Sequence, residues 1–266
     1  SRMEEHMTAY NIPAIWQWDG EPDRDRLADA FRQLIRRHDS LRTSFHMTGG
    51  RAVQRVHPAV SFELEPGGPG PVDSTGRYLD RFVRPFDLTR APLLRAGIVS
   101  TGAREFLLVM DIHHIVADGL SMGILKRELA DCYVSRQLPQ LPARYIDYAV
   151  WQHNGRESSG IAAQKAYWLK RFPGEIPVLN LPLDAPRPAS QSFEGALVSF
   201  ALEPATAAAL IDLAQQRGFT TFTVVLSVFY ILLARLSGQE DIVTGTPTAG
   251  RRYVELEGII GMFVNT

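Results

Sequence analysis

The chain has a single cysteine, Cys132, among its 266 residues, so it cannot form an internal disulfide. This fits a reducing compartment, and we expect a cytoplasmic location. The opening SRMEEHMTAYN is polar and carries both signs of charge, unlike a secretory leader. The most apolar stretch, Phe222 to Ala234, has 13 uncharged residues, whereas a membrane-spanning helix needs about 20. We expect a core helix there and no membrane partner.

An excess of positive charge is also missing. The formal net charge is -1, and charged residues make up 21% of the chain. Nucleic-acid-binding domains usually carry a basic excess gathered on one face. Arginine gathers here only in two short groups, Arg36, Arg37 and Arg42 and then Arg251 and Arg252. Such groups indicate solvated helix ends or salt-bridge partners, and we predict no nucleic-acid partner.

The chain contains segments typical of both strands and helices. Short β-rich stretches alternate with stretches whose apolar residues recur at helical spacing, which predicts a mixed α/β fold. We predict strands at 11–18, 41–47, 51–57, 93–99 and 106–110, with helices at 23–35, 122–133, 143–153 and 160–172. Residues 106–110 are apolar without alternation, which indicates burial on both faces of that strand.

A change in composition near residue 180 predicts a division of the chain. Residues 173–190 contain five prolines and little periodicity, which is typical of a linker. We place one lobe at 1–175, a linker at 176–190 and part of a second lobe at 191–266. In this last part we predict strands at 197–202 and 241–246, with two helices between them that stop at Gly218 and Gly238.

The residues with a chemical signature follow the buried strand. They read His113-His114-Ile115-Val116-Ala117-Asp118-Gly119. A histidine at the end of a strand is held by rigid backbone, and Asp118 lies close enough in sequence to fix the turn. The helix that follows offers unpaired N–H groups near the same point, and Gly119 lets a ligand approach the backbone. A base, an orienting carboxylate and backbone donors are the parts that acyl transfer requires.

Several other kinds of site lack their usual sequence pattern. The chain has no G-x-S-x-G, which a serine hydrolase of the Ser-His-Asp type would need. No glycine-rich phosphate loop follows a strand, and no further Cys or His lies at zinc-ligand spacing near the histidine pair. A histidine pair after a strand can also be purely structural. Elimination leaves direct acyl transfer between two bound substrates, with no bound metal and no cofactor of its own.

Five further segments accompany the histidine motif, and together they resemble a known family. They are RHDSLRTSF at 37–45, RPFDL at 84–88 followed by APLLR at 91–95, YIDYAVW at 145–151 followed by YW at 167–168, DIVTGTP at 241–247 followed by GR at 250–251, and GMFVNT at 261–266. In this order they resemble the core motifs of the condensation domains of nonribosomal peptide synthetases. Those domains belong to the chloramphenicol acetyltransferase-like superfamily, which shares His-His-x-x-x-Asp-Gly.

The resemblance implies a fold and a reaction. The expected fold is a chloramphenicol acetyltransferase-like lobe, with a mixed sheet flanked by helices, followed by the start of a second similar lobe. The first core motif is not found, and the match ends at the sixth motif. The implied reaction joins a donor acyl or peptidyl thioester to the α-amine of an acceptor aminoacyl thioester. Both substrates are implied to hang on phosphopantetheine arms of upstream and downstream carrier proteins, beside an adenylation domain.

The resemblance also implies roles for individual residues. His114 is expected to be catalytic, with Gly119 offering its N–H to the thioester oxygen. His113 is expected to be structural. Asp118 is expected to pair with an arginine of the second motif and so to support the site, with Arg42 as the first choice and Arg37 as the second. Asn265 is expected to line the cleft from the second lobe.

Other functions share parts of this pattern. Epimerisation domains have the same fold and histidine motif, and they depend on an acidic residue of the second lobe. A non-catalytic module that docks carrier proteins is a further alternative, as is an acyltransferase that uses coenzyme A. A heterocyclising domain would carry aspartate in place of His113, which argues against that reaction.

Overall fold

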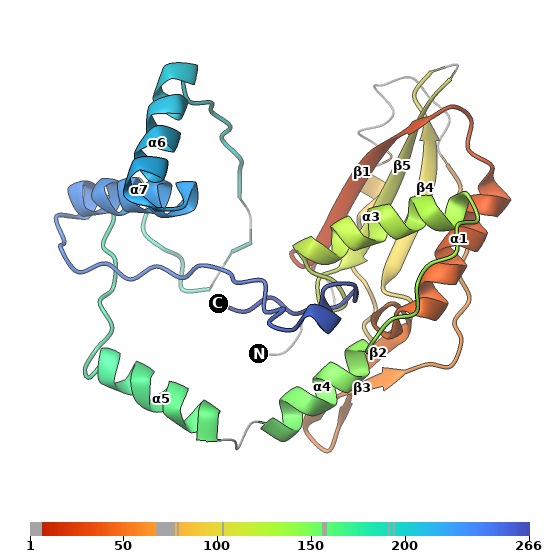
Figure 1. The fold of residues 1–266 in the computed structure, drawn as a ribbon, viewed down its shortest axis with the longest axis horizontal. Coiled ribbons are helices and arrows are strands. Elements are labelled where there is room, and N and C mark those ends of the chain that lie inside the picture. Colours follow the sequence, from red (N-terminus) through yellow and green to blue (C-terminus); the bar gives the residue numbers. More distant parts are fainter. Residues whose placement is uncertain are drawn as a thin grey trace. The chain divides into compact units, whose positions relative to one another are not determined.

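The computed structural model describes residues 7–67, 78, 80–102, 104–155, 159–190, 192–193 and 195–266. Most of the opening segment SRMEEHMTAYN, for which we predict no secretory leader, therefore lies outside the described residues. The chain forms two compact units (Figure 1). The first comprises Ser1–Ser158 with Pro247–Thr266, and the second is Ser159–Thr246.

A three-stranded antiparallel sheet lies at the centre of the first unit. Its order is β1 (Asn11–Asp19), β5 (Glu105–His113) and β4 (Leu94–Ser100). An isolated parallel bridge joins Glu65 to Gly97 and gives the sheet its mixed character. A separate hairpin pairs β2 (Thr43–Thr48) with β3 (Arg51–Val56) after the short helix η1 (Asp39–Arg42). The strands predicted in this part of the chain are confirmed, and β5 extends to the histidine motif.

Two helices cover one face of the central sheet (Figure 1). They are α1 (Arg24–Arg37) and α3 (Gly119–Tyr133). The Asp23 side chain starts α1 by accepting a hydrogen bond from the Arg26 N–H at 3.0 Å. Alternate residues of β5, such as Leu108, Met110 and Ile112, enter the core beneath these helices. This core fixes β5, and with it the position at which the histidine motif begins.

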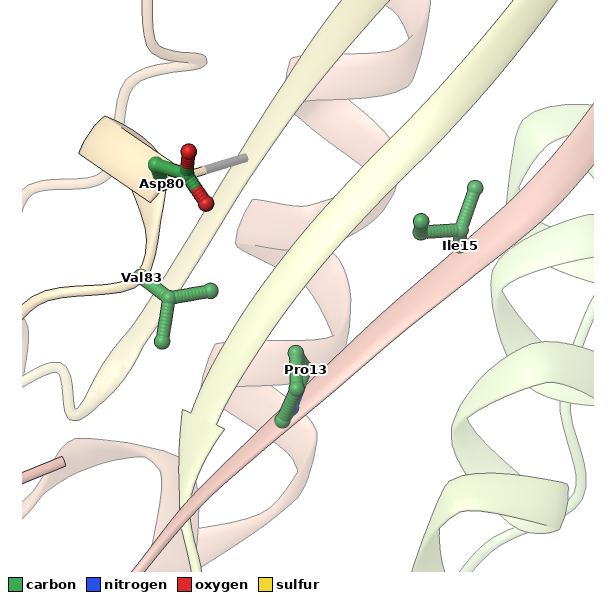
Figure 2. Close-up of a pocket in the computed structure, with 4 residues that line it drawn as sticks. All are labelled: Pro13, Ile15, Asp80 and Val83. Carbon is green, nitrogen blue, oxygen red and sulfur yellow. The ribbon is translucent and has the colours of Figure 1, made fainter. Parts of the chain in front are cut away.

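The opposite face of the sheet is also partly covered. Val109 of β5 packs there with Val99 and Phe82, so β5 is buried on both faces as its sequence predicts. A shallow hollow lies on this side, lined by Pro13 and Ile15 of β1 and by Asp80 and Val83 of the segment across from it (Figure 2). None of the residues predicted for the site lines this hollow.

The second unit is helical in its described part. It contains α5 (Ser159–Arg171), α6 (Pro204–Arg217) and α7 (Thr221–Ser237). Gly218 and Gly238 end α6 and α7 in the left-handed conformation, with φ of 67° and 69°. The strands predicted at 197–202 and 241–246 are wrong. A strand needs a hydrogen-bonded neighbour, and the described residues of this unit form no strand that could pair with Leu197 or Val198, which are 91% and 85% exposed.

The two compact units divide the chain differently from the predicted lobes. The helix α4 (Tyr145–Asn154) belongs to the first unit and α5 to the second, whereas the lobe boundary was predicted at residue 175. Residues 247–266, including the short helix η3 (Val254–Leu256), pack with the first unit. The lobes at 1–175 and 191–266 with a linker at 176–190 stay a prediction.

Among the described residues, no single helix is long and apolar enough to span a membrane. The bent pair α6 and α7, which meet at 111°, reaches that length and composition when taken together.

Candidate active site at the end of strand β5

The backbone of the two histidines is held on both sides. His113 ends β5, and its N–H donates to the Leu93 carbonyl at 3.0 Å. The next N–H, of His114, donates to the Tyr10 carbonyl at 2.8 Å. A turn closes immediately, because the Val116 N–H donates to the His113 carbonyl at 3.0 Å. These hydrogen bonds fix the backbone from which the half-buried His114 side chain extends.

The His113 ring is half-buried between two aromatic side chains. Its centre lies 6.1 Å from that of Phe86, edge-on, and 6.2 Å from that of Tyr10. Burial, with a smaller effect from neighbouring His114, lowers the pKa of His113 to about 4. The neutral ring accepts a hydrogen bond at Nδ1 from the Ile115 N–H at 3.1 Å, so its proton belongs on Nε2. These contacts hold the His113 ring in place, and its structural role stays a prediction.

We expect His113 to make the protein less stable as the pH falls from 6.5 toward about 4. The ring binds a proton below pH 6.5 in the unfolded chain but stays neutral until about pH 4 when folded. The unfolded state gains the proton first, so stability is lost across this window. Because the ring is only half-buried, we expect roughly 1–2 kcal/mol. Urea unfolding at pH 7 and pH 4.5 should show a larger loss for the wild type than for His113→Asn, and equal losses would contradict this prediction.

Asp118 is buried at the start of α3, where it caps the helix. Its Oδ1 accepts hydrogen bonds from the Ser121 N–H at 2.8 Å and from the Ser121 hydroxyl at 2.7 Å, and its Oδ2 accepts one from the Phe263 N–H at 3.1 Å. The Arg251 guanidinium lies 3.1 Å from Oδ1. Burial alone would raise the pKa of Asp118, but the hydrogen bonds from Ser121 and Phe263 and the charge of Arg251 together lower it. Asp118 is therefore a carboxylate that holds its loop.

The predicted partner of Asp118 is wrong. Arg42 pairs instead with Asp39, three residues away on η1, and donates to the His57 carbonyl at 2.5 Å. The second choice, Arg37, pairs with Glu128 of α3 at 3.1 Å. Both arginines of the second motif therefore form ion pairs with carboxylates other than Asp118. The pairing of Asp118 with Arg251 joins residues 133 positions apart.

Arg251 is the site residue that the sequence analysis missed as a partner. Its side chain is 4% exposed, and its Nη1 donates to the carbonyls of Leu256 and Ile259 at 2.5 Å and 2.6 Å. The guanidinium carbon lies 4.0 Å from the centre of the Phe263 ring. One side chain thus ties the loop of residues 251–263 to Asp118. Arg251 belongs to the Gly250-Arg251 pair of the fifth motif, and that membership is the sequence feature that could have identified it as the partner of Asp118.

A second group of contacts anchors the same segment beside α3. The Ser121 hydroxyl accepts from the Gly261 N–H at 3.1 Å, and the Ser40 hydroxyl donates to the Ile260 carbonyl at 2.7 Å. The Ile260 N–H donates to Nδ1 of the buried His38, whose Nε2 lies 2.7 Å from Glu128. Residues 260–263 are therefore held against the start of α3, which follows the histidine motif.

We expect Gly250→Ala to loosen this segment. Gly250 has a φ of 67°, and an added Cβ would overlap the carbonyl oxygen of Phe263. Left-handed backbone at a non-glycine residue costs about 1–3 kcal/mol, and the overlap adds to that. Urea unfolding should show this loss, and hydrogen exchange should show faster exchange of the Phe263 N–H. Gly123→Ala in α3, where an added Cβ meets nothing within 4 Å, is the control. It should raise stability by up to about 1 kcal/mol, because alanine favours helix over glycine, and it should leave the Phe263 exchange unchanged. Equal behaviour of the two variants would contradict the prediction.

The remaining predicted residues lie at the edges of this arrangement. Gly119 is the exposed first residue of α3, and an added Cβ would meet nothing within 4 Å. Its φ is outside the left-handed region, so the turn does not demand glycine there. Asn265 pairs through its backbone with Thr248, and its side chain is exposed. The oxyanion role of Gly119 and the cleft role of Asn265 stay predictions.

The segment at the end of β5 holds the parts that proton transfer and dipolar stabilisation require. A half-buried imidazole, His114, lies in the turn that precedes α3, and the first N–H groups of α3 have no partner within the helix. Among the described residues, no group of three or more His, Cys, Asp or Glu side chains is arranged to hold a metal ion.

The comparisons with known proteins identify the family. The model of the Condensation domain family matches residues 1–266, and the chain belongs to this family. The chain is 45% identical over 265 residues to tyrocidine synthase 3 of Brevibacillus parabrevis, covering 100% of this chain and 4% of that protein. It is 43% identical over 266 residues to bacitracin synthase 2 of Bacillus licheniformis, covering 100% of this chain and 10% of that protein.

Solved structures show the same fold. An X-domain from teicoplanin biosynthesis is 28% identical, with a TM-score of 0.86 over 96% of this chain and 59% of that chain. The SgcC5 protein from Streptomyces globisporus is also 28% identical, with a TM-score of 0.77 over 97% of this chain and 60% of that chain. The chain thus spans a small part of the curated relatives and less than two thirds of these structures. The predicted fold class is confirmed.

Proposed function

We propose that the protein containing these residues joins a donor acyl or peptidyl thioester to the α-amine of an acceptor aminoacyl thioester, forming an amide. The family and the peptide-synthase relatives support this reaction. The observation that carries the proposal is the fixed position of His114, between the end of β5 and the Asp118-capped start of α3.

In this reaction we propose three tasks for His114: accepting a proton, positioning the amine and stabilising the tetrahedral intermediate. An imidazole exchanges protons near neutral pH, so it can accept a proton from the attacking amine. Because an α-amine has a pKa of roughly 8, part of it is already neutral at pH 7, and the base need not do all the work. Positioning the amine and stabilising the charged tetrahedral intermediate are tasks of comparable weight. The N–H of Gly119, with open space beside it, is the donor that we propose for the thioester oxygen.

The proposed partners follow from the substrates. We propose that upstream and downstream carrier proteins present both thioesters on phosphopantetheine arms, next to an adenylation domain, and that the protein binds no cofactor of its own. We propose a cytoplasmic location, which the single cysteine supports. We also propose the division into lobes at 1–175 and 191–266. In this arrangement Asn265 lines the substrate cleft.

Product analysis tests the proposed function. The protein that contains this chain is mixed with donor and acceptor carrier proteins, each loaded with its thioester, and the acceptor carrier is analysed by mass spectrometry. Omission of the donor thioester is the control. We expect a condensed product on the acceptor carrier when both substrates are present. Inversion of an α-carbon without a new amide would overturn the proposal in favour of epimerisation, and transfer from coenzyme A alone would indicate a different acyltransferase.

A further inference from the structure

The sheet face that carries His113 has a buried charged group that the mechanism does not use. Asp111 of β5 is fully buried and pairs with Arg95, directly opposite it on β4, at 2.8 Å. The Asn11 amide also donates to Asp111 at 2.8 Å. A buried ion pair is a weak stabiliser, because desolvation of both charges offsets most of their attraction. Its role is therefore sought in the groups that Arg95 holds in place.

Arg95 holds the chain segment that crosses this face. Its Nη1 donates to the Arg84 carbonyl and its Nη2 to the Pro85 carbonyl, both at 2.7 Å. The guanidinium carbon lies 3.6 Å from the centre of the Phe86 ring. One planar group thus fixes two successive carbonyls and stacks on the following side chain, which a lysine could not reproduce. Asp111 anchors the guanidinium from below, so the position of Phe86 is set from the sheet.

Phe86 in turn contacts the histidine motif. It is 8% exposed, and its ring meets that of His113 edge-on at 87°. His113 accepts the Ile115 N–H at Nδ1 while its own carbonyl accepts the Val116 N–H. The turn that carries His114 therefore depends on the orientation of the His113 ring, and that orientation depends on Phe86.

We propose that Arg95 and Phe86 are positioning residues for His114: Arg95 seats Phe86 against His113, and His113 holds the backbone turn that presents His114. This assigns a role to the RPFDL and APLLR segments, which otherwise have none in the reaction. The proposal rests on the proposed function only in taking His114 as the reacting residue.

Nuclear magnetic resonance of the histidine rings tests the first step without any substrate. Phe86→Leu keeps an apolar side chain but removes the flat ring beside His113. We expect the pKa of His113 to rise from about 4 toward the ordinary 6.5 and the Nε2–H form to lose its dominance. Exchange of the Ile115 N–H should become roughly tenfold faster, because its acceptor is no longer held. Arg95→Lys, which keeps the charge opposite Asp111, should change both readouts in the same direction.

Phe62→Leu is the matched control. Phe62 is 6% exposed and packs against Phe31, with ring centres 5.1 Å apart, in the core beneath α1. It should lower stability by a similar amount while leaving the His113 titration and the Ile115 exchange as in the wild type. If Phe62→Leu shifts both readouts as much as Phe86→Leu, or if Phe86→Leu and Arg95→Lys shift neither, the proposal is overturned.

Kinetics with loaded carrier proteins test the second step. Misplacement of a reacting group lowers the rate of the bound complex, so we expect Phe86→Leu to lower kcat about tenfold with little change in KM. An unchanged kcat in a variant whose His113 titration has shifted would overturn the link to His114. A wild type that forms no amide while the His113 readouts behave as expected would sink the proposed function and leave the contact between Phe86 and His113 standing.

Discussion

We expect Asp118→Ala to lower the free energy of unfolding by about 3–5 kcal/mol, because it leaves a buried guanidinium without its carboxylate. The Arg251 side chain is 4% exposed, so water cannot solvate its charge in place of the lost carboxylate. The variant also removes the cap of α3 and the acceptor of the Phe263 N–H. Loss of stability and loss of activity should therefore come together.

Urea unfolding of the single and double variants measures this coupling. Asp118→Ala combined with Arg251→Met should cost much less than the sum of the two single variants, since the second change removes the charge that the first left unpaired. Arg90→Ala is the control, because Arg90 is 85% exposed in its pair with Asp87, and exposed pairs contribute about 0–1 kcal/mol. An Asp118→Ala protein with native stability but no activity would contradict a supporting role and would favour a direct part in catalysis.

Much of the first unit could be predicted from the sequence because its signals are local. Residues 24–37 combine an acidic cap at Asp23 with one apolar face, and α1 forms there. The unbroken apolar run in β5 reflects burial beneath α1 and α3 and on the opposite face. These patterns report on the backbone a few residues away, which is the range over which sequence periodicity carries information.

The second unit shows where local signals fail. Residues 197–202 form a short apolar run interrupted only by Ser199, as a buried strand can, yet Leu197 and Phe200 are 91% and 85% exposed and no strand forms. Strand formation depends on a hydrogen-bonded partner, which a local apolar run cannot supply. The helices α6 and α7 satisfy their hydrogen bonds internally, and both were predicted with their glycine stops.

The site was predicted in part. The histidines and Asp118 stand in one short segment, and the resemblance to the family located them. The partner of Asp118 was not predictable in the same way, because Arg251 lies 133 residues away in the chain. Arg37, Arg42 and Arg251 all carry the same charge, and all three lie in motifs of the family. The structure distinguishes them, because Asp39 pairs with Arg42 and Glu128 pairs with Arg37.

We expect His114→Ala to leave the fold intact and to lower amide formation by about 10²- to 10⁴-fold, the range typical of a positioned general acid or base. His114 is half-buried, and the hydrogen bond to Tyr10 comes from its backbone, which alanine retains. His153→Ala is the matched control, since His153 is exposed on α4 in the same unit. It should leave the rate unchanged, and all three proteins should unfold at the same urea concentration.

The most direct test is therefore a single-turnover measurement of condensed product on loaded carrier proteins, with wild type, His114→Ala and His153→Ala compared at equal stability. Amide formation by the wild type and by His153→Ala, with a loss of at least about a hundredfold in His114→Ala, is the predicted result. Amide formation by His114→Ala at the wild-type rate would contradict the assignment of His114 as the reacting histidine.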